Sequence, residues 1–479
     1  MPVKRFLKSA FLISAGGMLP LLSSFVLLIP FTSNLNTSDY GALAIYISFS
    51  LLVQFLMNFG IDTYMSVHYY DYKNDRPALK KFVGSLFGLL FLIGIILITV
   101  FCIGGKLLFD VIFQGGEISF FPYGFMSVLT AFFNAIFRTY VNLQVFSENS
   151  RRYFLFGLFN FIVTVAISTL LVYKYPFTLI GPMWGRLLSG ILIFILSIAF
   201  VFKEYGITYS KNLFSEIKNY CFPLVIFSVL TWALAYFNNF ILNAMETTTE
   251  VGIYDFALKC ALLIEFGGLG LLSSINPRVY QLWKSNALAE STPGENRYHH
   301  IFSSFNILFI ALNIVVIPVV VKLFVHNESY YASIELLPFI FISFAFRGLY
   351  NLFSNPLIYY KKTKALPRVL FISAVIQIIS AILLVKYFGI WGAVWSYIMI
   401  KPVQVFFLWL ESRRVFRFRF NMIKMIIIPV VYCVTVILIW EYTRIDFFYK
   451  GLLQLAVALI LVGSVYPKEI IGIRSILRK

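Results

Sequence analysis

Two arginines, each followed by an asparagine at helical spacing, are the residues of this chain whose types and positions suggest chemistry. Arg138 precedes Asn142 by four residues in one apolar run, and Arg347 precedes Asn351 by four in another. Residues four apart share one face of a helix, so each arginine lies beside its asparagine. Arginine presents a planar fork of donors that matches phosphate oxygens, and asparagine adds neutral donors. The pattern therefore predicts two helix faces that contact an anion.

The two arginine segments occupy matching places in an internal repeat. Arg347 follows Arg138 by 209 residues, and Asn351 follows Asn142 by the same interval. Four further pairs share an offset of 211 residues: Gly41 with Gly252, Phe177 with Phe388, Gly181 with Gly392, and Trp184 with Trp395. These common offsets indicate that a unit of six helices is duplicated, and the even number makes the halves parallel repeats. Parallel repeats predict that the two arginines lie on opposite walls of one central cleft.

The composition places these arginines inside a membrane. Of the 479 residues, 60% are hydrophobic and 13% are charged, whereas a soluble domain is usually about 25% charged. Apolar runs of about 20 residues, each long enough to cross a ~30 Å hydrocarbon core, recur along the chain. We predict an all-α polytopic membrane protein with fourteen transmembrane helices, near 10–31, 41–62, 82–104, 118–143, 153–173, 178–202, 220–244, 252–275, 301–325, 334–360, 367–387, 390–410, 424–441 and 448–466.

The distribution of basic residues supports this number of helices. With a cytoplasmic N-terminus, the inner segments hold 28 of the 39 Lys and Arg residues, and the outer loops hold 6. Lys and Arg gather on the cytoplasmic side of membrane proteins, so we expect both termini to be cytoplasmic. The same inner anchor accounts for the net charge of +18. Nucleic acid is therefore not expected as a partner.

The repeat divides the predicted fold into three parts. Residues 1–210 form an N-lobe with helices 1–6, and residues 211–415 form a C-lobe with helices 7–12. Residues 416–479 add helices 13 and 14 and a cytoplasmic tail. The longest loop is expected near 276–300, on the cytoplasmic side, with a turn at Thr292-Pro293-Gly294. The two lobes are expected to enclose the cleft and to alternate its access.

Five basic side chains lie within the predicted spans, and they define the candidate site. A charge at the bilayer centre costs about 2.5–3.5 kcal/mol, so such residues usually face a wet cavity or an acidic partner. We predict a cationic cleft whose substrate-binding residues are Arg138, Arg347, Asn142, Asn351, Arg186, Lys259 and Lys401. The structural alternatives are snorkelling for the arginines, packing for Lys401 and interhelical hydrogen bonds for the asparagines.

Glu265 is the one acid that lies clearly deep within a predicted span. Two roles are open for it. It pairs with Lys259 on the same helix, or it carries a coupling proton as the ion-coupling residue of a transporter. The residues alone favour the structural pairing.

Signals of catalytic chemistry are missing from the sequence. Gly104-Gly105-Lys106 lacks the spacing of a phosphate-binding loop, and a zinc motif of the His-Glu-x-x-His type does not occur. The four histidines are expected in loops, and the four cysteines are isolated packing residues. We therefore expect no catalytic residue, no metal and no cofactor, and a protein that is not an enzyme.

Short motifs resemble one known family over essentially the whole chain. They are Asp39-Tyr40-Gly41, Asn58-Phe59-Gly60-Ile61-Asp62, Gly252-Ile253-Tyr254 and Asn276-Pro277-Arg278. They resemble the bacterial polysaccharide-export flippases, which are O-antigen-type translocases of the multidrug/oligosaccharidyl-lipid/polysaccharide exporter superfamily. The resemblance implies transport of an undecaprenyl-pyrophosphate-linked glycan, used for lipopolysaccharide or related polysaccharides, across the bacterial cytoplasmic membrane. Membrane lipids are then partners, and an ion gradient of protons or sodium is a candidate energy source.

Rival functions are distinguished by specific features of the sequence. A lipid II flippase shares fourteen helices and a cationic cavity, so it stays open as an alternative. A drug or cation antiporter of the same superfamily more often has twelve helices and an acidic cavity. A glycosyltransferase or polymerase is expected to have a large outer loop, and none of the predicted outer loops is longer than about 15 residues. A membrane scaffold does not need deep arginines.

Overall fold

The computed structural model describes residues 3–113, 118–208, 211–285, 290–467 and 469. Its regular elements within these ranges are helices, together with an isolated bridge between Glu290 and Arg417. Fourteen helical segments are long and apolar enough to cross a membrane. The prediction of an all-α polytopic membrane protein with fourteen transmembrane helices is therefore confirmed.

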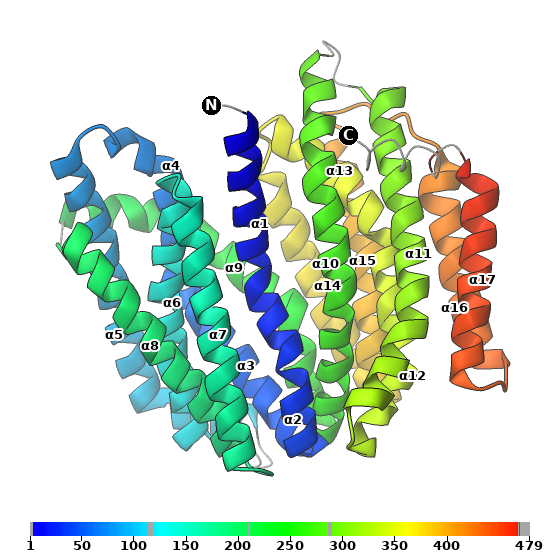
Figure 1. Cartoon of the computed structure of the whole chain (residues 1–479), viewed down its shortest axis with the longest axis horizontal. Helices are drawn as coiled ribbons and strands as arrows, with labels where there is room; N and C mark the ends of the chain where they lie inside the picture. The colour runs from blue at the N-terminus through cyan, green and yellow to red at the C-terminus, as the bar shows by residue number, and fades with distance from the viewer. Residues whose placement is uncertain (1–2, 114–117, 209–210, 286–289, 468, 470–479) are drawn as a thin grey trace. The chain divides into compact units, whose positions relative to one another are not determined.

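The chain packs into two units, Met1–Gly252 and Ile253–Lys479. The first contains α1 (Val3–Val26), α2 (Leu28–Asn34), α3 (Thr37–Asn58), α4 (Ile61–Tyr72), α5 (Arg76–Ile112), the π-helical turn η1 (Phe120–Gly124), α6 (Phe125–Phe146), α7 (Ser150–Lys174), α8 (Ile180–Glu204) and α9 (Lys211–Met245) (Figure 1). Helix α6 is the hub of this unit because it packs against α3, α4, α5, α7 and α8. Helix α9 packs against α3, α4 and α5.

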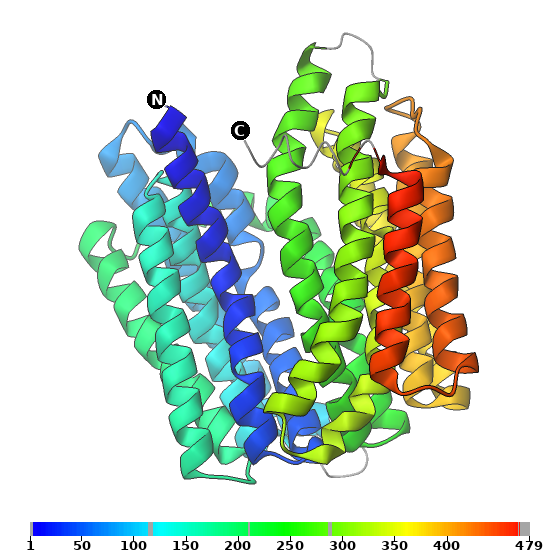
Figure 2. The ribbon, with the colours of Figure 1, turned by 45° about the vertical axis from the view of Figure 1, so that its right-hand side comes forward.

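Helix α10 (Thr248–Ser285) begins in the first unit and continues into the second. The second unit also contains α11 (Pro293–Phe324), η2 (Glu328–Tyr331), α12 (Ala332–Ile342), η3 (Ser343–Phe346), α13 (Arg347–Tyr359), α14 (Ala365–Phe388), α15 (Ile390–Ser412), η4 (Ile423–Ile427), α16 (Ile428–Tyr442) and α17 (Phe447–Val465). Helices α14 and α15 form a hairpin, and α15 also packs against α12 and α13. Helices α16 and α17 lie side by side, and α17 packs along α11 (Figure 2).

Glycines of the repeat lie where two helices meet most closely. A Cβ atom on Gly181 would lie 2.7 Å from the carbonyl oxygen of Leu171, and one on Gly392 would lie 2.2 Å from that of Leu384. The α7–α8 and α14–α15 hairpins therefore have the same close contact in the two units. Only a residue without a Cβ atom fits there, which explains in physical terms why the repeat shows glycine at this position.

The connection between α10 and α11 differs from the prediction. In place of a loop near 276–300, α10 continues to Ser285 and α11 begins at Pro293. Thr292 and Glu295 form a capping box, in which the Glu295 backbone N–H donates to Thr292 Oγ1 at 3.2 Å. A proline in the first turn fits this start because its missing N–H is not needed there. The predicted turn is therefore the beginning of a helix.

The expectation that the histidines lie in loops is wrong for three of them. His68 lies on α4, and His299 and His300 lie on α11. His299 is 2% exposed, and its Nε2 lies 3.7 Å from Oε1 of the fully buried Glu295. The first turns of α11 therefore place His299 and Glu295 in the packed interior of the second unit.

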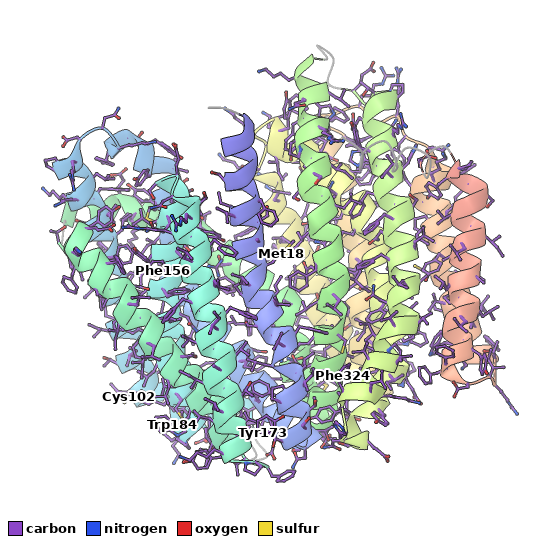
Figure 3. All side chains as sticks on the ribbon, in the orientation of Figure 1. Met18, Cys102, Phe156, Tyr173, Trp184 and Phe324 are labelled. Atoms are coloured by element: carbon purple, nitrogen blue, oxygen red, sulfur yellow. The ribbon has the colours of Figure 1, made fainter. Side chains whose placement is uncertain are left out.

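Exposed aromatic side chains mark one end of the first unit. Tyr173 at the end of α7 is 58% exposed and Trp184 near the start of α8 is 44% exposed. Both lie toward the same end of the unit (Figure 3). Tyrosine and tryptophan are enriched at membrane–water interfaces, so this pair is typical of a boundary of the hydrocarbon layer.

Candidate functional site

The two arginines lie in the most internal of the fourteen candidate spans. In the apolar 18-residue stretch that identifies each span, 61% of the residues are buried for Phe120–Phe146, which carries Arg138, and 72% for Glu328–Tyr359, which carries Arg347. The second span is interrupted by the 3₁₀ turn η3, which ends directly before Arg347. Both arginines therefore lie on helices that are enclosed mainly by other helices of their own unit.

Asp62 gathers the polar side chains around Arg138 in the first unit. It lies in the first turn of α4, directly after the break between α3 and α4. Thr139 Oγ1 donates to Asp62 Oδ1 at 2.7 Å, and Asn142 Nδ2 donates to Asp62 Oδ2 at 2.8 Å. Arg138 Nε lies 3.8 Å from Asp62 Oδ2, which is an ion pair but too long for a hydrogen bond. The carboxylate thus holds Asn142 firmly and Arg138 loosely.

Arg347 has an acidic partner in the second unit. Its Nη2 atom lies 3.5 Å from Glu265 Oε1. The Arg347 side chain is 17% exposed, whereas that of Arg138 is 52% exposed. Within the described residues, neither guanidinium donates a hydrogen bond to another group of the protein. Both arginines therefore retain donors for a ligand, and Arg138 is the more accessible of the two.

The expected pairing of Glu265 with Lys259 is not what the structure shows. Lys259 Nζ lies 2.6 Å from Asp255 Oδ2, one helical turn away, while Glu265 faces Arg347. Residues six apart point to different sides of a helix, whereas residues four apart share one face. The geometry of α10 therefore separates Lys259 from Glu265 and gives each its own partner.

An asparagine takes the place of the Asp62 carboxylate as the hydrogen-bond acceptor in the second unit. Asn351 Nδ2 donates to Asn276 Oδ1 at 3.0 Å, and Asn355 Nδ2 donates to the same oxygen at 3.1 Å. Asn276 thus receives Asn351 as Asp62 receives Asn142 in the first unit. The two units share this arrangement, but the acceptor is charged in the first and neutral in the second.

The remaining predicted cations have different surroundings. Arg186 is half-buried on α8, and no ion pair of this residue occurs within the described ranges. Lys401 Nζ lies 4.4 Å from the centre of the Tyr397 ring, one turn earlier on α15. Arg138 and Arg186 lie in the first unit, and Lys259, Arg347 and Lys401 lie in the second. Their convergence on one cleft stays a prediction.

Sequence reasoning missed Asp62 and Asn276 as members of the two clusters. Asp62 is the last residue of the predicted span 41–62, with nothing in the spacing to connect it to Arg138. The signal that could have found it is Asn58-Phe59-Gly60, since a glycine after a long apolar run often ends a helix. Asn276 precedes Pro277 and lies in the predicted loop, although α10 continues through both residues.

Comparisons with known proteins concern the family and the fold of this chain. A family model described as "Polysaccharide biosynthesis protein" matches residues 6–283. A search of the curated proteins gives no match. The fold is similar to the lipid II flippase MurJ in an inward closed conformation, with 14% identity, a TM-score of 0.73 and coverage of 96% of this chain and 100% of that one.

Two further solved structures share the fold. One is an inward-facing multidrug resistance MATE family transporter of the MOP superfamily, with 14% identity and a TM-score of 0.70 over 83% of this chain and 94% of that one. Another is the MATE multidrug transporter DinF-BH, with 11% identity and a TM-score of 0.61 over 86% of this chain and 96% of that one. At these identities the likeness concerns the fold. Since the family model covers more than half of its length, the chain belongs to the polysaccharide biosynthesis protein family.

Proposed function

We propose that this chain is a flippase that moves an undecaprenyl-pyrophosphate-linked oligosaccharide across the bacterial cytoplasmic membrane by alternating access of a cationic site. The observation that carries the proposal is the availability of the hydrogen-bond donors of Arg138 and Arg347. They lie in the two most internal spans, and within the described residues neither guanidinium is hydrogen-bonded. Membership of a polysaccharide biosynthesis family supports a glycan as the cargo.

The acidic neighbours make these arginines suitable for exchange with a phosphate. Asp62 and Glu265 offset the cost of placing a positive charge in the membrane interior. Asp62 lies 3.8 Å from Arg138 and Glu265 lies 3.5 Å from Arg347, so both guanidinium groups keep donors that are not hydrogen-bonded. A diphosphate offers shorter, bidentate hydrogen bonds, which are about twice as strong as those between neutral groups. Each arginine is thus held in place when the cargo is absent and gains bonds when the cargo arrives.

The other site residues extend this cationic character. Asn142 and Asn351 lie one turn beyond the arginines and add neutral donors. Arg186 and Lys401 add positive charge, and among the described residues no carboxylate lies within the 4 Å of an ion pair from either of them. Lys259 contributes less, because Asp255 lies 2.6 Å from its charge.

Glu265 is the ion-coupling residue in this proposal. Its side chain is 37% exposed, and its carboxylate lies beside Arg347. A proton or a sodium ion that binds this carboxylate removes its attraction for the guanidinium. Glu265 then competes less with the cargo for the donors of Arg347. Ion binding and diphosphate binding thereby become linked.

A lipid II flippase is the second candidate. The fold similarity to MurJ extends over 96% of this chain and the whole of that one. A diphosphate carried on a lipid is common to both proposed cargoes, so the arginines serve either of them. The two functions differ in the sugar and in the polymer that depends on it.

Deleting the gene in its native bacterium tests the proposal. We expect a lipid-linked oligosaccharide to accumulate on the inner leaflet, a surface glycan to disappear, and peptidoglycan synthesis to continue. Re-expression of the intact chain should restore the surface glycan. Accumulation of lipid II with growth arrest would support the second candidate instead. If neither intermediate accumulates, the flippase proposal is wrong.

A further inference from the structure

Beyond Arg347, two helices of the second unit carry neutral polar and aromatic side chains on facing sides. The stripe runs toward the end of α13, which is predicted to be cytoplasmic. We call it the amide–tyrosine lane, and it consists of Asn351, Asn355 and Tyr359 on α13 with Asn276 and Tyr280 on α10. Successive members on each helix are four residues apart, so they are neighbours in a stripe that begins at Arg347 and winds slowly around α13. The lane thus starts at one of the proposed phosphate contacts.

Hydrogen bonds connect the members of the lane from helix to helix. Asn276 Oδ1 accepts from Asn351 at 3.0 Å and from Asn355 at 3.1 Å. Tyr280 in turn donates its hydroxyl to Asn355 Oδ1 at 3.2 Å. Across the described ranges, the Nδ2 group of the half-buried Asn276 donates to no other group of the protein. The network therefore fixes the side chains and leaves a donor for a ligand.

The far end of the lane is a rigid aromatic platform. The rings of Tyr280 and Tyr359 are 5.6 Å apart at an angle of 30°. Both pack against Trp283, which is 2% exposed, with ring centres at 5.6 Å and 5.2 Å. The tyrosines themselves are half-buried. The buried tryptophan supports one side of the platform, and both tyrosines keep some exposed surface.

The chemistry of the lane suits a carbohydrate better than an ion. None of its five members is charged, and an asparagine amide both donates and accepts hydrogen bonds, as a sugar hydroxyl does. The C–H faces of a sugar ring are apolar and pack against aromatic faces. The first unit does not repeat the arrangement. The position equivalent to Asn355, 209 residues earlier, is occupied by Phe146. In that unit the acceptor is the charged Asp62 and not a neutral amide. The lane is therefore a property of the second unit.

We infer that the amide–tyrosine lane binds the glycan part of the cargo, with sugar rings against Tyr280 and Tyr359 and a hydroxyl on Asn276. The diphosphate then lies at Arg347. Twelve residues separate Arg347 from Tyr359, which is about 18 Å of helix at 1.5 Å per residue. That length accommodates several sugars in line. The inference rests on the proposed function and adds to it the residues that distinguish a glycan-bearing lipid from a bare carrier.

A binding assay with two probes tests the inference on the full-length protein in nanodiscs. The probes are undecaprenyl diphosphate and the undecaprenyl-diphosphate-linked glycan that accumulates in cells lacking this chain. We expect the wild-type protein to bind the glycan probe more tightly. Tyr359→Leu should weaken binding of the glycan probe about three- to tenfold, as expected for loss of one aromatic contact. Its affinity for undecaprenyl diphosphate should stay unchanged, and Tyr359→Phe should behave as wild type.

Two further variants complete the test. Asn276→Asp keeps the oxygen that accepts from Asn351 and Asn355 but removes the Nδ2 donor. Its carboxylate also adds a negative charge that disfavours a diphosphate, so this variant should weaken the glycan probe more than undecaprenyl diphosphate. Tyr387→Leu changes a tyrosine that is 73% exposed at the end of α14 and should affect neither probe. Melting temperatures confirm that each variant is folded.

Each outcome separates this inference from the proposed function. Equal wild-type affinity for the two probes would overturn the lane as a glycan site while leaving the flippase proposal standing. Equal weakening of both probes by Tyr359→Leu would assign the tyrosine a structural role and overturn the inference as well. Failure of the wild-type protein to bind either probe would overturn the proposed function.

Discussion

At the scale of single residues, Arg138 and Arg347 have the same neighbours in type but different exposure. We expect Arg138→Ala and Arg347→Ala each to reduce surface-glycan display at least about tenfold, because each removes charge-assisted hydrogen bonds to the diphosphate. Lysine at either position should restore part of the activity, since the charge survives and the planar fork is lost. The measurements are surface glycan by antibody or lectin labelling and the amount of protein in the membrane.

The different exposure of the two arginine side chains allows a labelling experiment that checks the structure at both positions. Arg138→Cys should react faster than Arg347→Cys with a membrane-impermeant maleimide, because the side chains are 52% and 17% exposed. This experiment uses protein whose native cysteines, including the exposed Cys102, have been replaced. Arg151→Ala, at an exposed position at the start of α7, should leave export unchanged. Normal export by both alanine variants would assign the two arginines a structural role.

Glu265 allows a second prediction at this scale. If its carboxylate exchanges a coupling ion, Glu265→Gln should abolish export while the protein level stays normal, because the amide keeps the size of the side chain without its charge. Glu441→Gln, at an exposed position near the end of α16, is the matched control. Loss of the protein from the membrane would show instead that Glu265 mainly neutralises Arg347. Normal export would show that neither role is essential.

The sequence indicated which of these residues share a helix face, but it did not predict their partners. Arg138 and Asn142 share a face, as their spacing indicates. The approach of Asp62 to Arg138 depends on a break in the backbone, where Phe59 and Gly60 have φ values of 48° and 75°. Such a break changes the direction of the following helix, and hydrophobic periodicity does not report it.

At the scale of helices, the close contact of α3 with the start of α10 gives a sharp test. A Cβ atom on Gly41 would lie 1.8 Å from the carbonyl oxygen of Thr248. Gly41→Ala forces two backbones apart, and overpacking typically costs about 1–3 kcal/mol, so we expect a lower melting temperature in detergent. Gly104→Ala is the matched control on α5, because a Cβ atom there has no neighbour within 4 Å. Equal melting temperatures for the two variants would contradict this packing.

Glu469 connects the residues after α17 to the other helices of the second unit. Its carboxylate lies 2.7 Å from Lys424 Nζ and 3.3 Å from His300 Nδ1. Burial is the largest single influence and opposes ionisation of this group, but the hydrogen bond from Lys424, a backbone hydrogen bond and the charges of Lys424 and His300 together outweigh it and lower the pKa of Glu469 below its ordinary value. A lowered pKa stabilises the fold above the unfolded value of about 4.3 and loses this effect as the pH falls toward the folded value.

The pH dependence of stability tests this interaction. We expect the melting temperature of the wild-type protein to fall between neutral pH and about pH 4. Glu469→Gln should lower the melting temperature at neutral pH and flatten its decline on acidification. Glu328→Gln, at an exposed position in η2, should leave the wild-type profile unchanged. An unchanged profile in Glu469→Gln would exclude this carboxylate as a stabilising group.

Helix number could be predicted from the sequence far better than helix ends. Apolar runs identify segments that cross a membrane, and all fourteen occur in the structure. Several helices continue into polar residues, as α5 does from Arg76 to Ile112 and α10 does to Ser285. Caps and packing outside the hydrocarbon layer decide where such helices end, and hydropathy carries little information about them.

At the scale of the whole molecule, the alternation of loops gives the final prediction. Reporter fusions near Asp110, Glu246 and Glu328 should be outside, and those near Arg151, Lys211 and Lys362 should be inside. The reason is the gathering of Lys and Arg on the cytoplasmic side. Paired alkaline phosphatase and green fluorescent protein fusions measure the two sides. One inverted pair in this set would contradict a protein with fourteen spans and cytoplasmic termini.

The repeat and the packing divide the chain at different places. The repeat predicts a second half that begins near residue 211, so that α9 is the first helix of that half. The packing units divide at Gly252, inside the continuous helix α10, and α9 packs against α3, α4 and α5 of the first unit. A helix that the repeat assigns to the second half thus packs on helices of the first unit. The border that the repeat predicts and the border between the packing units therefore lie one helix apart.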